Sequence, residues 1–254
     1  MRKKGAPFLR RALFCSMRKV ILAVFFILLS FLLLGPLASQ YAIQANNDTA
    51  GQFIGEKIIY NVKLGAFKLG RATFSRSKDY LVTFETKVTN FYDLEEIYYN
   101  PKSGLPVKII RNIRSFSGKE KIIESYDQKK FILTITKHKG KKKEELKIKC
   151  GAVIHNAIML PFYLRHIPKL KIGWSLLVEL PNQKFTIKLT AIEKLKIGKN
   201  IFEVYRFDSI PKKIEIWVTT DKRRIPVRIN GAGVFGYSLI MKEYSPESLS
   251  KSSP

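Results

Sequence analysis

The sequence predicts a mainly β protein, built as a curved antiparallel sheet in the form of an open barrel or a sandwich. Two observations support this prediction. Apolar and polar residues alternate over many short segments after residue 50, and turns rich in Gly, Pro and Asn separate those segments at close intervals. A third observation, the loss of this alternation around residues 153–168, predicts one or two short helices there. An apolar helix is expected ahead of the β domain.

The N-terminal segment predicts export. Val20–Ala38 holds no charged residue, and four basic residues lie in the ten positions before it. This order is typical of a signal peptide, and Gly35-Pro36 followed by small residues favours cleavage. The run is also long enough to cross a bilayer, which needs about 20 apolar residues. We therefore expect residues 1–45 to be a signal peptide or a membrane anchor with a short linker. The protein would be periplasmic or, alternatively, anchored to the inner membrane by residues 20–38.

The composition is strongly basic. The chain has 46 Lys and Arg residues against 20 Asp and Glu residues, for a net charge of +26. Such a protein is attracted to acidic surfaces. Because export is expected, we predict an anionic membrane surface or an envelope glycan as partner, and no nucleic acid. A solvated, lysine-rich surface without a specific partner is the alternative. The sequence does not indicate an oligomeric state.

Residues 53–245 are expected to form a single β-rich domain, and residues 246–254 a disordered tail. The chain has two cysteines, Cys15 and Cys150. If a signal peptide is removed, one cysteine remains, so we expect no intramolecular disulfide. The hydrophobic core must then hold the domain together.

The first strand is predicted where Ile58, Tyr60, Val62 and Leu64 alternate with polar residues, before Gly65 turns the chain. Further predicted strands follow the same pattern: 67–74, Leu81–Val88, Ile132–Lys137, Glu144–Lys149, Phe185–Leu195, Phe202–Phe207, Ile214–Thr219, Val227–Ile229 and Tyr237–Met241. The predicted turns are Asn100–Gly104, Ser117–Lys119, His138–Lys141, Ile197–Asn200 and Asp221–Arg224.

One segment breaks the alternation. Val153–Leu170 places Ile154, Ile158 and Phe162 at helical spacing, and Pro161 favours a helical turn over a strand interior. We predict one or two short helices packed on the sheet as a lid.

No motif for catalysis or metal binding is evident, so we predict no enzyme activity, no metal site and no cofactor. His138, His155 and His166 have no Cys or carboxylate at metal-ligand spacing. Cys150 lies near His155 in sequence, but a lone Cys after a strand is more often an inert apolar residue. Gly231–Gly236 has the G-x-G-x-x-G spacing, yet it joins two predicted strands, whereas a dinucleotide site needs a strand and a helix.

Two charge clusters have structural interpretations. Asp93, Glu95 and Glu96 could supply paired carboxylates for acid–base chemistry, but the lysine excess favours ion pairs. The run Lys137–Lys149 lacks the aromatic residues that stack on nucleic-acid bases. We interpret it as a projecting hairpin that repels its neighbours or contacts anionic membrane.

Four further motifs stand out in the chain: Gly55–Tyr60 with Gly65 and Gly70, Tyr126–Lys130, Phe162–Arg165, and Ile216–Arg228 with its W-x-x-x-D-x-x-R-x-P-V-R pattern. Together they resemble the motifs of the DUF3108 family of exported bacterial proteins of unknown function. The resemblance covers about Gly55–Tyr244. It implies an extracytoplasmic β-rich fold and no established activity.

The motif residues also have structural interpretations. Asn156 stands where the family usually has an Asp, and an Asn caps a helix as well as an Asp does. Trp217 is expected in the core, Asp221 and Arg224 would close a turn, and Pro226 fits an edge strand.

We predict a non-catalytic envelope protein that binds a lipid or another amphiphile in an apolar concavity of the β fold. The candidate binding residues are aromatic and basic members of the family motifs: Phe162, Tyr163, Arg165, Trp217 and Arg224. The helical segment would cover the mouth of the concavity, and Arg165 would pair with a lipid phosphate. The alternative is a structural or adaptor protein that docks on anionic membrane or glycan through its basic surface. An enzyme acting on envelope polymers would need two carboxylates facing each other across a cleft.

Overall fold

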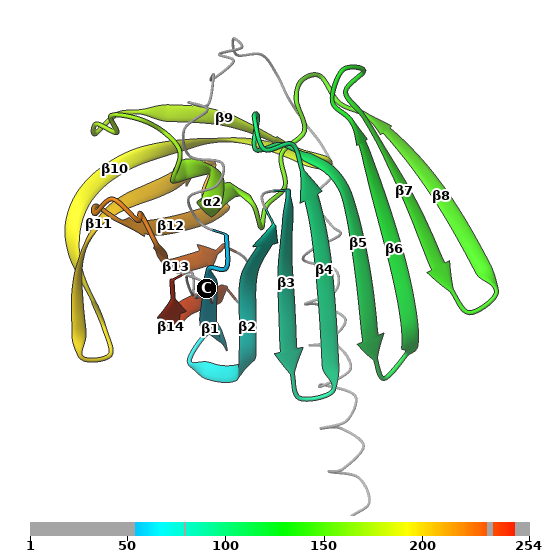
Figure 1. Cartoon of the computed structure of the whole chain (residues 1–254), viewed down its shortest axis with the longest axis horizontal. Coiled ribbons are helices and arrows are strands. Elements are labelled where there is room, and N and C mark those ends of the chain that lie inside the picture. The colour runs from blue at the N-terminus through cyan, green and yellow to red at the C-terminus, as the bar shows by residue number, and fades with distance from the viewer. Residues whose placement is uncertain (1–53, 79, 233–235, 247–254) are drawn as a thin grey trace, which may run out of the picture. The chain divides into compact units, whose positions relative to one another are not determined.

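A computed structural model describes residues 54–78, 80–232 and 236–246. In these residues the chain forms one antiparallel sheet of fourteen strands and one short helix (Figure 1). The elements are β1 (Lys57–Leu64), β2 (Phe67–Lys78), β3 (Leu81–Val88), β4 (Phe91–Tyr99), β5 (Pro106–Ser115), β6 (Gly118–Asp127), β7 (Ile132–Lys139), β8 (Lys142–Lys149), α2 (Leu160–Leu164), β9 (Ser175–Leu180), β10 (Gln183–Ile197), β11 (Asn200–Ile210), β12 (Ile214–Thr219), β13 (Pro226–Gly231) and β14 (Tyr237–Ser245).

The predicted mainly β, antiparallel architecture is confirmed. The sandwich alternative is wrong, because every strand belongs to the same sheet, and the sheet is not closed into a barrel. The expected N-terminal apolar helix and the expected C-terminal tail after residue 246 lie outside the described residues. Within the described ranges, no helix has both the length and the apolar character needed to cross a membrane.

The sheet consists of two meanders joined by the strands at their ends. Strands β1–β8 pair in chain order, β9–β14 do the same, and β14 pairs with β1. In that central ladder Leu64 lies opposite Tyr237 and Lys57 opposite Ser245. The first and last strands therefore lie side by side in the middle of the sheet, while β8 and β9 form its two edges.

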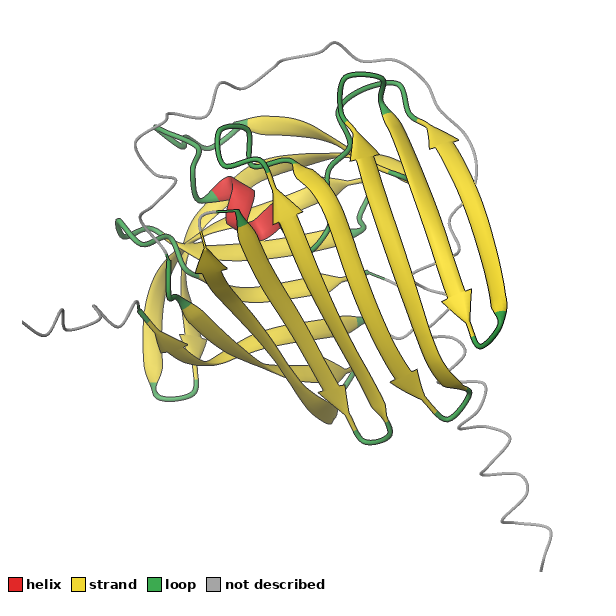
Figure 2. Cartoon of the chain, turned by 45° about the vertical axis from the view of Figure 1, so that its right-hand side comes forward, coloured by secondary structure: helices red, strands yellow, loops and turns green. Residues whose placement is uncertain are grey.

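The sheet curves around α2, so that the helix lies between the β1–β8 meander and the β9–β14 meander (Figure 1, Figure 2). We call these two meanders the limbs of the sheet. Register shifts in the β1–β2 and β10–β11 pairs mark bulges, which bend strands. Next to the first of these bulges, Gly70 of β2 approaches β3 so closely that a Cβ atom would lie 2.0 Å from the carbonyl oxygen of Lys87. This position therefore accepts only glycine without a shift of the backbone.

The apolar core lies on the concave face in two clusters, and α2 contributes to both. Phe162 belongs to the cluster that includes Ile58, Tyr60 and Phe74, whereas Leu160 and Leu164 belong to the cluster on β9–β13. The Phe162 ring stacks on Phe74 of β2, with centroids 3.4 Å apart and an interplanar angle of 7°. The short helix thus joins the two limbs of the sheet from inside.

The helical segment is shorter than the sequence predicted. Only α2 is α-helical, and the residues before it form turns and extended chain. The side-chain oxygen of Asn156 accepts hydrogen bonds from the N–H groups of Ile158 (2.9 Å) and Met159 (3.1 Å), which makes a turn ahead of the helix. Asn156 therefore has a structural role, as predicted, but it is not the N-cap of the helix: that position is Met159, which makes no side-chain capping hydrogen bond.

One prediction for the closing family motif, Ile216–Arg228, is wrong. Pro226 was expected on an edge strand, but it begins β13, which lies between β12 and β14. Its missing N–H group falls where the β12–β13 register shifts, at the pair Val218 and Pro226. The Gly231–Gly236 segment leads from β13 to β14, which pair antiparallel, so the dinucleotide interpretation is excluded, as predicted.

Candidate functional site

Residues from three family motifs meet at the end of α2. Arg165 follows the helix, and its guanidinium forms a bidentate pair with Glu56, which precedes β1; the two N···O distances are 2.6 and 2.8 Å. The same guanidinium donates to the carbonyl oxygen of Arg223 at 2.8 and 3.1 Å. The side chains of Arg165 and Glu56 are 2% and 1% exposed. The pair is therefore a desolvated clamp between the β8–β9 connector and the first strand.

The turn after β12 supports this clamp. A side-chain oxygen of Asp221 accepts hydrogen bonds from the N–H groups of Arg223 and Arg224, each at 3.0 Å. Arg224 then donates to the carbonyl oxygens of Arg165 (3.2 Å) and Ile167. These carbonyls lie at the end of α2, where the helix itself supplies no donor. The predicted turn-closing role of Asp221 is confirmed, and Arg224 anchors the helix end.

The structure brings four of the five predicted binding residues together at the end of α2 and separates the fifth, Trp217. Phe162, Arg165 and Arg224 meet at the clamp. Tyr163 lies beside them, half-buried, with its ring edge-on to His155 at 5.8 Å. A lipid phosphate would have to displace Glu56 to reach Arg165, so the contacts favour a structural role for that arginine.

Trp217 belongs to the core cluster that also holds Phe162, Ile58 and Tyr60. Its hydrogen bond and its cation–π contacts, however, are made with residues outside the clamp. The Trp217 indole donates to Glu193 at 2.7 Å, and the guanidinium groups of Arg206 and Arg228 lie 5.6 and 5.0 Å from its ring centroid. Trp217 is buried in the core, as predicted.

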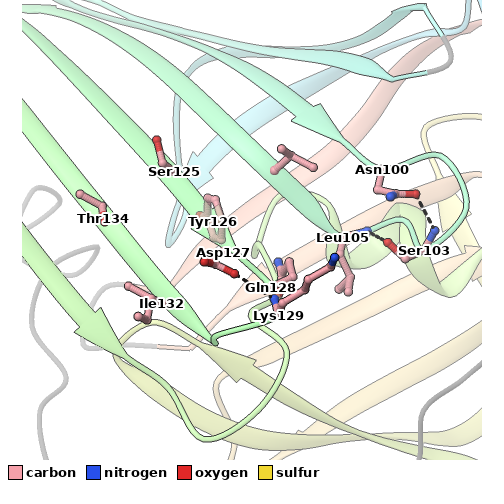
Figure 3. Close-up of a pocket in the computed structure, with 11 residues that line it drawn as sticks. Asn100, Ser103, Leu105, Ser125, Tyr126, Asp127, Gln128, Lys129, Ile132 and Thr134 are labelled. Atoms are coloured by element: carbon pink, nitrogen blue, oxygen red, sulfur yellow. Dashed lines mark hydrogen bonds between the residues drawn. The ribbon is translucent and has the colours of Figure 1, made fainter.

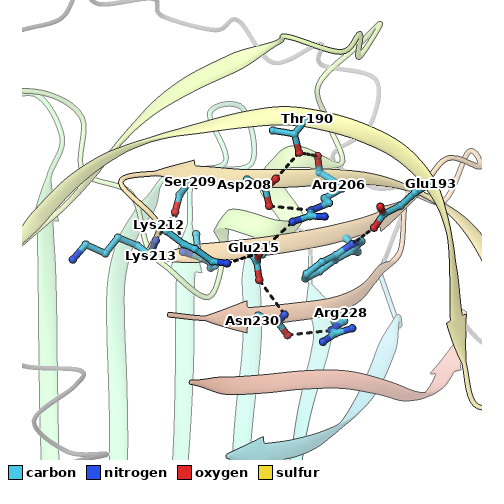
Figure 4. A network of polar contacts seen from close by, with 12 residues as sticks. Thr190, Glu193, Arg206, Asp208, Ser209, Lys212, Lys213, Glu215, Arg228 and Asn230 are labelled. Carbon is cyan, nitrogen blue, oxygen red and sulfur yellow. Dashed lines mark hydrogen bonds and ion pairs between the residues drawn. The ribbon is translucent and has the colours of Figure 1, made fainter. Parts of the chain in front are cut away.

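Around Trp217 the charged groups are matched by partners (Figure 4). Arg206 donates to Asp208 at 3.1 Å and lies 3.4 Å from Glu215. Glu215 also accepts a hydrogen bond from Asn230 at 3.2 Å and pairs with Lys212 at 3.1 Å. We assign this network to holding β11, β12 and β13 in register.

A second polar cluster lies on the concave face of β4, β5 and β6. Arg111 donates to both carboxylate oxygens of Asp93, at 3.0 and 2.8 Å for its Nε, and lies 3.3 Å from Glu95. Burial raises the pKa of Glu95 to about 8 against the opposing charge of Arg111, and the charges of Asp93 and Glu124 add to the rise. Burial also raises the pKa of Glu124, which accepts a hydrogen bond from the Tyr126 hydroxyl.

The ion pairing predicted for Asp93 is confirmed by its contact with Arg111, whereas Glu95, whose pKa is raised to about 8, keeps its proton at neutral pH. Arg111 and Glu124 were missed. A signal existed in the sequence, because Arg111 stands between Ile109 and Ile113 at a position where strand alternation calls for an inward side chain. The carboxylates of Asp93 and Glu95 on β4 and of Glu124 on β6 flank Arg111 on β5, so they lie on one wall of the sheet and do not face each other across a cleft. In the described part of the chain, no group of three or more His, Cys, Asp or Glu residues could hold a metal ion.

The surroundings of the two histidines and the cysteine of the connector favour their uncharged forms. Burial, together with the nearby charges of Arg165, Arg76 and Arg224, lowers the pKa of His166 to about 4. Burial also lowers the pKa of His155 and raises that of Cys150. A thiol whose pKa is raised is a poor nucleophile, so these groups fit a packing role.

An open pocket of about 480 Å³ lies where the β4–β5 loop meets the β6–β7 turn (Figure 3). Its polar lining groups stabilise these turns. Asn100 accepts hydrogen bonds from the N–H groups of Lys102 and Ser103, and Asp127 accepts from those of Lys129 and Lys130. The pocket therefore presents turn-forming groups and no arrangement for acid–base or nucleophilic chemistry.

Comparison with known proteins agrees with the motifs. A family model described as a protein of unknown function (DUF3108) matches residues 59–239. No curated protein and no solved structure matches the chain. The matched span runs from β1 into β14 and so includes nearly the whole sheet, with the clamp residues Arg165 and Arg224 inside it. The chain belongs to the DUF3108 family.

Proposed function

We propose that this protein is exported and binds a lipid or another amphiphile, without catalysis, on the concave apolar face of its sheet. This proposal is supported by an apolar surface on the concave face that remains partly exposed to solvent. Several apolar side chains of the concave face are only partly buried, from strands on both sides of the central ladder: Val62, Phe84, Ile135, Ile148, Leu239 and Met241.

The uncovered surface continues to an edge of the sheet. Ile135 of β7 lies opposite Leu146 of β8, and Leu146 is exposed. Strand β8 does not pair with β9, so an acyl chain could enter along this edge. Curved sheets that remain partly open enclose apolar ligands in this way.

The same face also offers polar contacts. Ile135 lies opposite Glu124 of β6, which belongs to the cluster around Arg111. A ligand with an apolar chain on Ile135 and Leu146 would place a polar head group near this cluster. The combination favours an amphiphile over a plain hydrocarbon.

Export is supported by the charge-free run Val20–Ala38 behind its basic flank. An envelope location gives the protein access to lipids and other amphiphiles. The absence of a catalytic arrangement in the described site favours binding over turnover.

Native mass spectrometry of protein purified without detergent tests the proposal. We expect a bound amphiphile that is released on unfolding. The variants Ile135→Lys and Thr136→Lys provide a matched pair, because adjacent residues of β7 point to opposite faces. Titration with the fluorescent amphiphile N-phenyl-1-naphthylamine should show lost binding for Ile135→Lys and retained binding for Thr136→Lys. Equal binding by both variants, with circular dichroism unchanged, would contradict the proposal.

A further inference from the structure

We propose that the hairpin turns at one end of β1–β8 dock on anionic lipid bilayers. Four turns join β1 to β2, β3 to β4, β5 to β6 and β7 to β8. Because successive strands run in opposite directions, these turns all lie at the same end of their strands, along the lower margin of the sheet in Figures 1 and 2. We call segments 63–68, 87–92, 114–119 and 138–143 the docking edge.

Two phenylalanines project from this edge. Phe67 is 75% exposed and Phe116 is 70% exposed, which makes them the most exposed large hydrophobic side chains among the described residues. Phe67 begins β2 directly after the turn at Gly65 (φ 56°), and Phe116 lies in the turn before Gly118 (φ 107°). A single exposed apolar side chain is ordinary. Two at hairpin tips four strands apart, or about 19 Å along the sheet, can enter the same lipid surface.

The charge of the docking edge fits the same partner. Its four segments contain nine Lys or Arg residues and no Asp or Glu. The three turns at the opposite end of these strands, 78–81, 99–106 and 127–132, contain four basic and two acidic residues. Their exposed large aromatic side chain, Tyr80, is 42% exposed and has the Lys78 ammonium 5.7 Å from its ring centroid. The basic excess is therefore concentrated at the end that also carries Phe67 and Phe116.

The chemistry of an anionic bilayer matches this arrangement. Lysines near a surface of anionic lipid gain electrostatic attraction, and their long aliphatic stems tolerate the interface. Aromatic side chains at the same level enter the boundary between head groups and acyl chains. Nucleic acid is disfavoured by the expected export. This docking edge is separate from the concave face, so the inference does not depend on the proposed amphiphile site.

The test uses the full chain with a tryptophan placed at either end of the strands. The variant Phe116→Trp reports on the docking edge, and Tyr80→Trp is the matched control at the opposite end. Each is mixed with vesicles of brominated phosphatidylcholine containing about one third phosphatidylglycerol. Both variants carry the same residues 20–38 and the same Trp174 and Trp217, so any membrane anchor contributes equally.

We expect the fluorescence of Phe116→Trp to be quenched at least about threefold more than that of Tyr80→Trp. The difference should shrink in high salt and in vesicles without phosphatidylglycerol. Adding Phe67→Ser, or replacing Lys141, Lys142 and Lys143 by Ser, should reduce it at least about twofold. Replacing Lys102, Lys129 and Lys130 by Ser should leave it unchanged. Equal quenching at both positions, or quenching that ignores phosphatidylglycerol and salt, would overturn the inference.

Discussion

Arg165 and Glu56 lie 109 positions apart in the chain, yet their side chains form a buried bidentate ion pair with N···O distances of 2.6 and 2.8 Å. The pair fixes the connector between the two meanders onto the start of β1. Because Arg165 also holds the carbonyl oxygen of Arg223, three segments distant in sequence depend on one guanidinium.

We expect Arg165→Met to lower the free energy of unfolding by about 3–5 kcal/mol, since it leaves the Glu56 carboxylate buried without its cation. Urea denaturation measures this loss. Lys130→Met is the control, because Lys130 and Asp127 form an exposed pair worth about 0–1 kcal/mol. A loss for Arg165→Met as small as that of the control would show that Glu56 does not rely on this pair.

The stacking of Phe162 on Phe74 predicts a second stability effect. Phe162→Ala removes a buried ring that joins the two limbs of the sheet, and it should cost about 3–5 kcal/mol of unfolding free energy. Phe67→Ala, at an exposed turn, should change that free energy by no more than about 0.5 kcal/mol. Comparable thermal midpoints for the two variants would argue against α2 as the link between the limbs.

Gly70 and Gly151 should respond differently to alanine. A Cβ at Gly70 would meet the backbone oxygen of Lys87 at 2.0 Å, whereas at Gly151 it would meet the flexible end of Lys184 at 3.2 Å. Gly70→Ala should therefore destabilise the protein by about 1–3 kcal/mol, and Gly151→Ala should be nearly neutral. Chemical denaturation of the two variants decides this, and a neutral Gly70→Ala would mean that β2 and β3 separate easily there.

Glu95 predicts a pH dependence of stability. The folded protein keeps the Glu95 proton up to about pH 8. The unfolded chain releases it near about pH 4.3, so the folded state binds more protons between these values. Protonated Glu95 therefore contributes fully to the free energy of unfolding below about pH 4, and this contribution is lost as the pH rises toward about 8.

The measurement is the free energy of unfolding at several pH values across this window. Glu95→Gln, which stays uncharged, should weaken the decline, whereas Glu145→Gln on the exposed strand β8 should not. If Glu95→Gln shows the same slope as the unsubstituted protein, the titrating group lies elsewhere.

Local features were predictable because they depend on neighbouring residues. The hairpin of β7 and β8 follows from alternation on both sides of His138–Lys141, and it is present as predicted. The Asp221 turn follows from side-chain hydrogen bonding to N–H groups two and three residues later. The predicted length of the helical segment was wrong, because helical spacing does not reveal that the side chain of Asn156 accepts hydrogen bonds from the N–H groups of Ile158 and Met159.

Features that depend on strand order could not be predicted. Alternation of apolar and polar residues assigns a face of the sheet to each residue but does not identify the partner strand. The pairing of β1 with β14 could therefore not be predicted. The cluster around Arg111 needs the registers of β4, β5 and β6 together. For the same reason the family motifs predicted that Arg165 and Arg224 matter, yet gave no sign that Glu56 is the partner of Arg165.

The pairing of β1 with β14 has a consequence for how the chain matures. The ladder in the middle of the sheet closes only when the two extremities of the domain meet, and contacts so distant in sequence make folding slow. Until β14 has emerged, β1 and β13 each present an open row of backbone donors and acceptors, which attract other chains. Each newly made chain of this protein therefore carries two open strand edges until its final strand is in place.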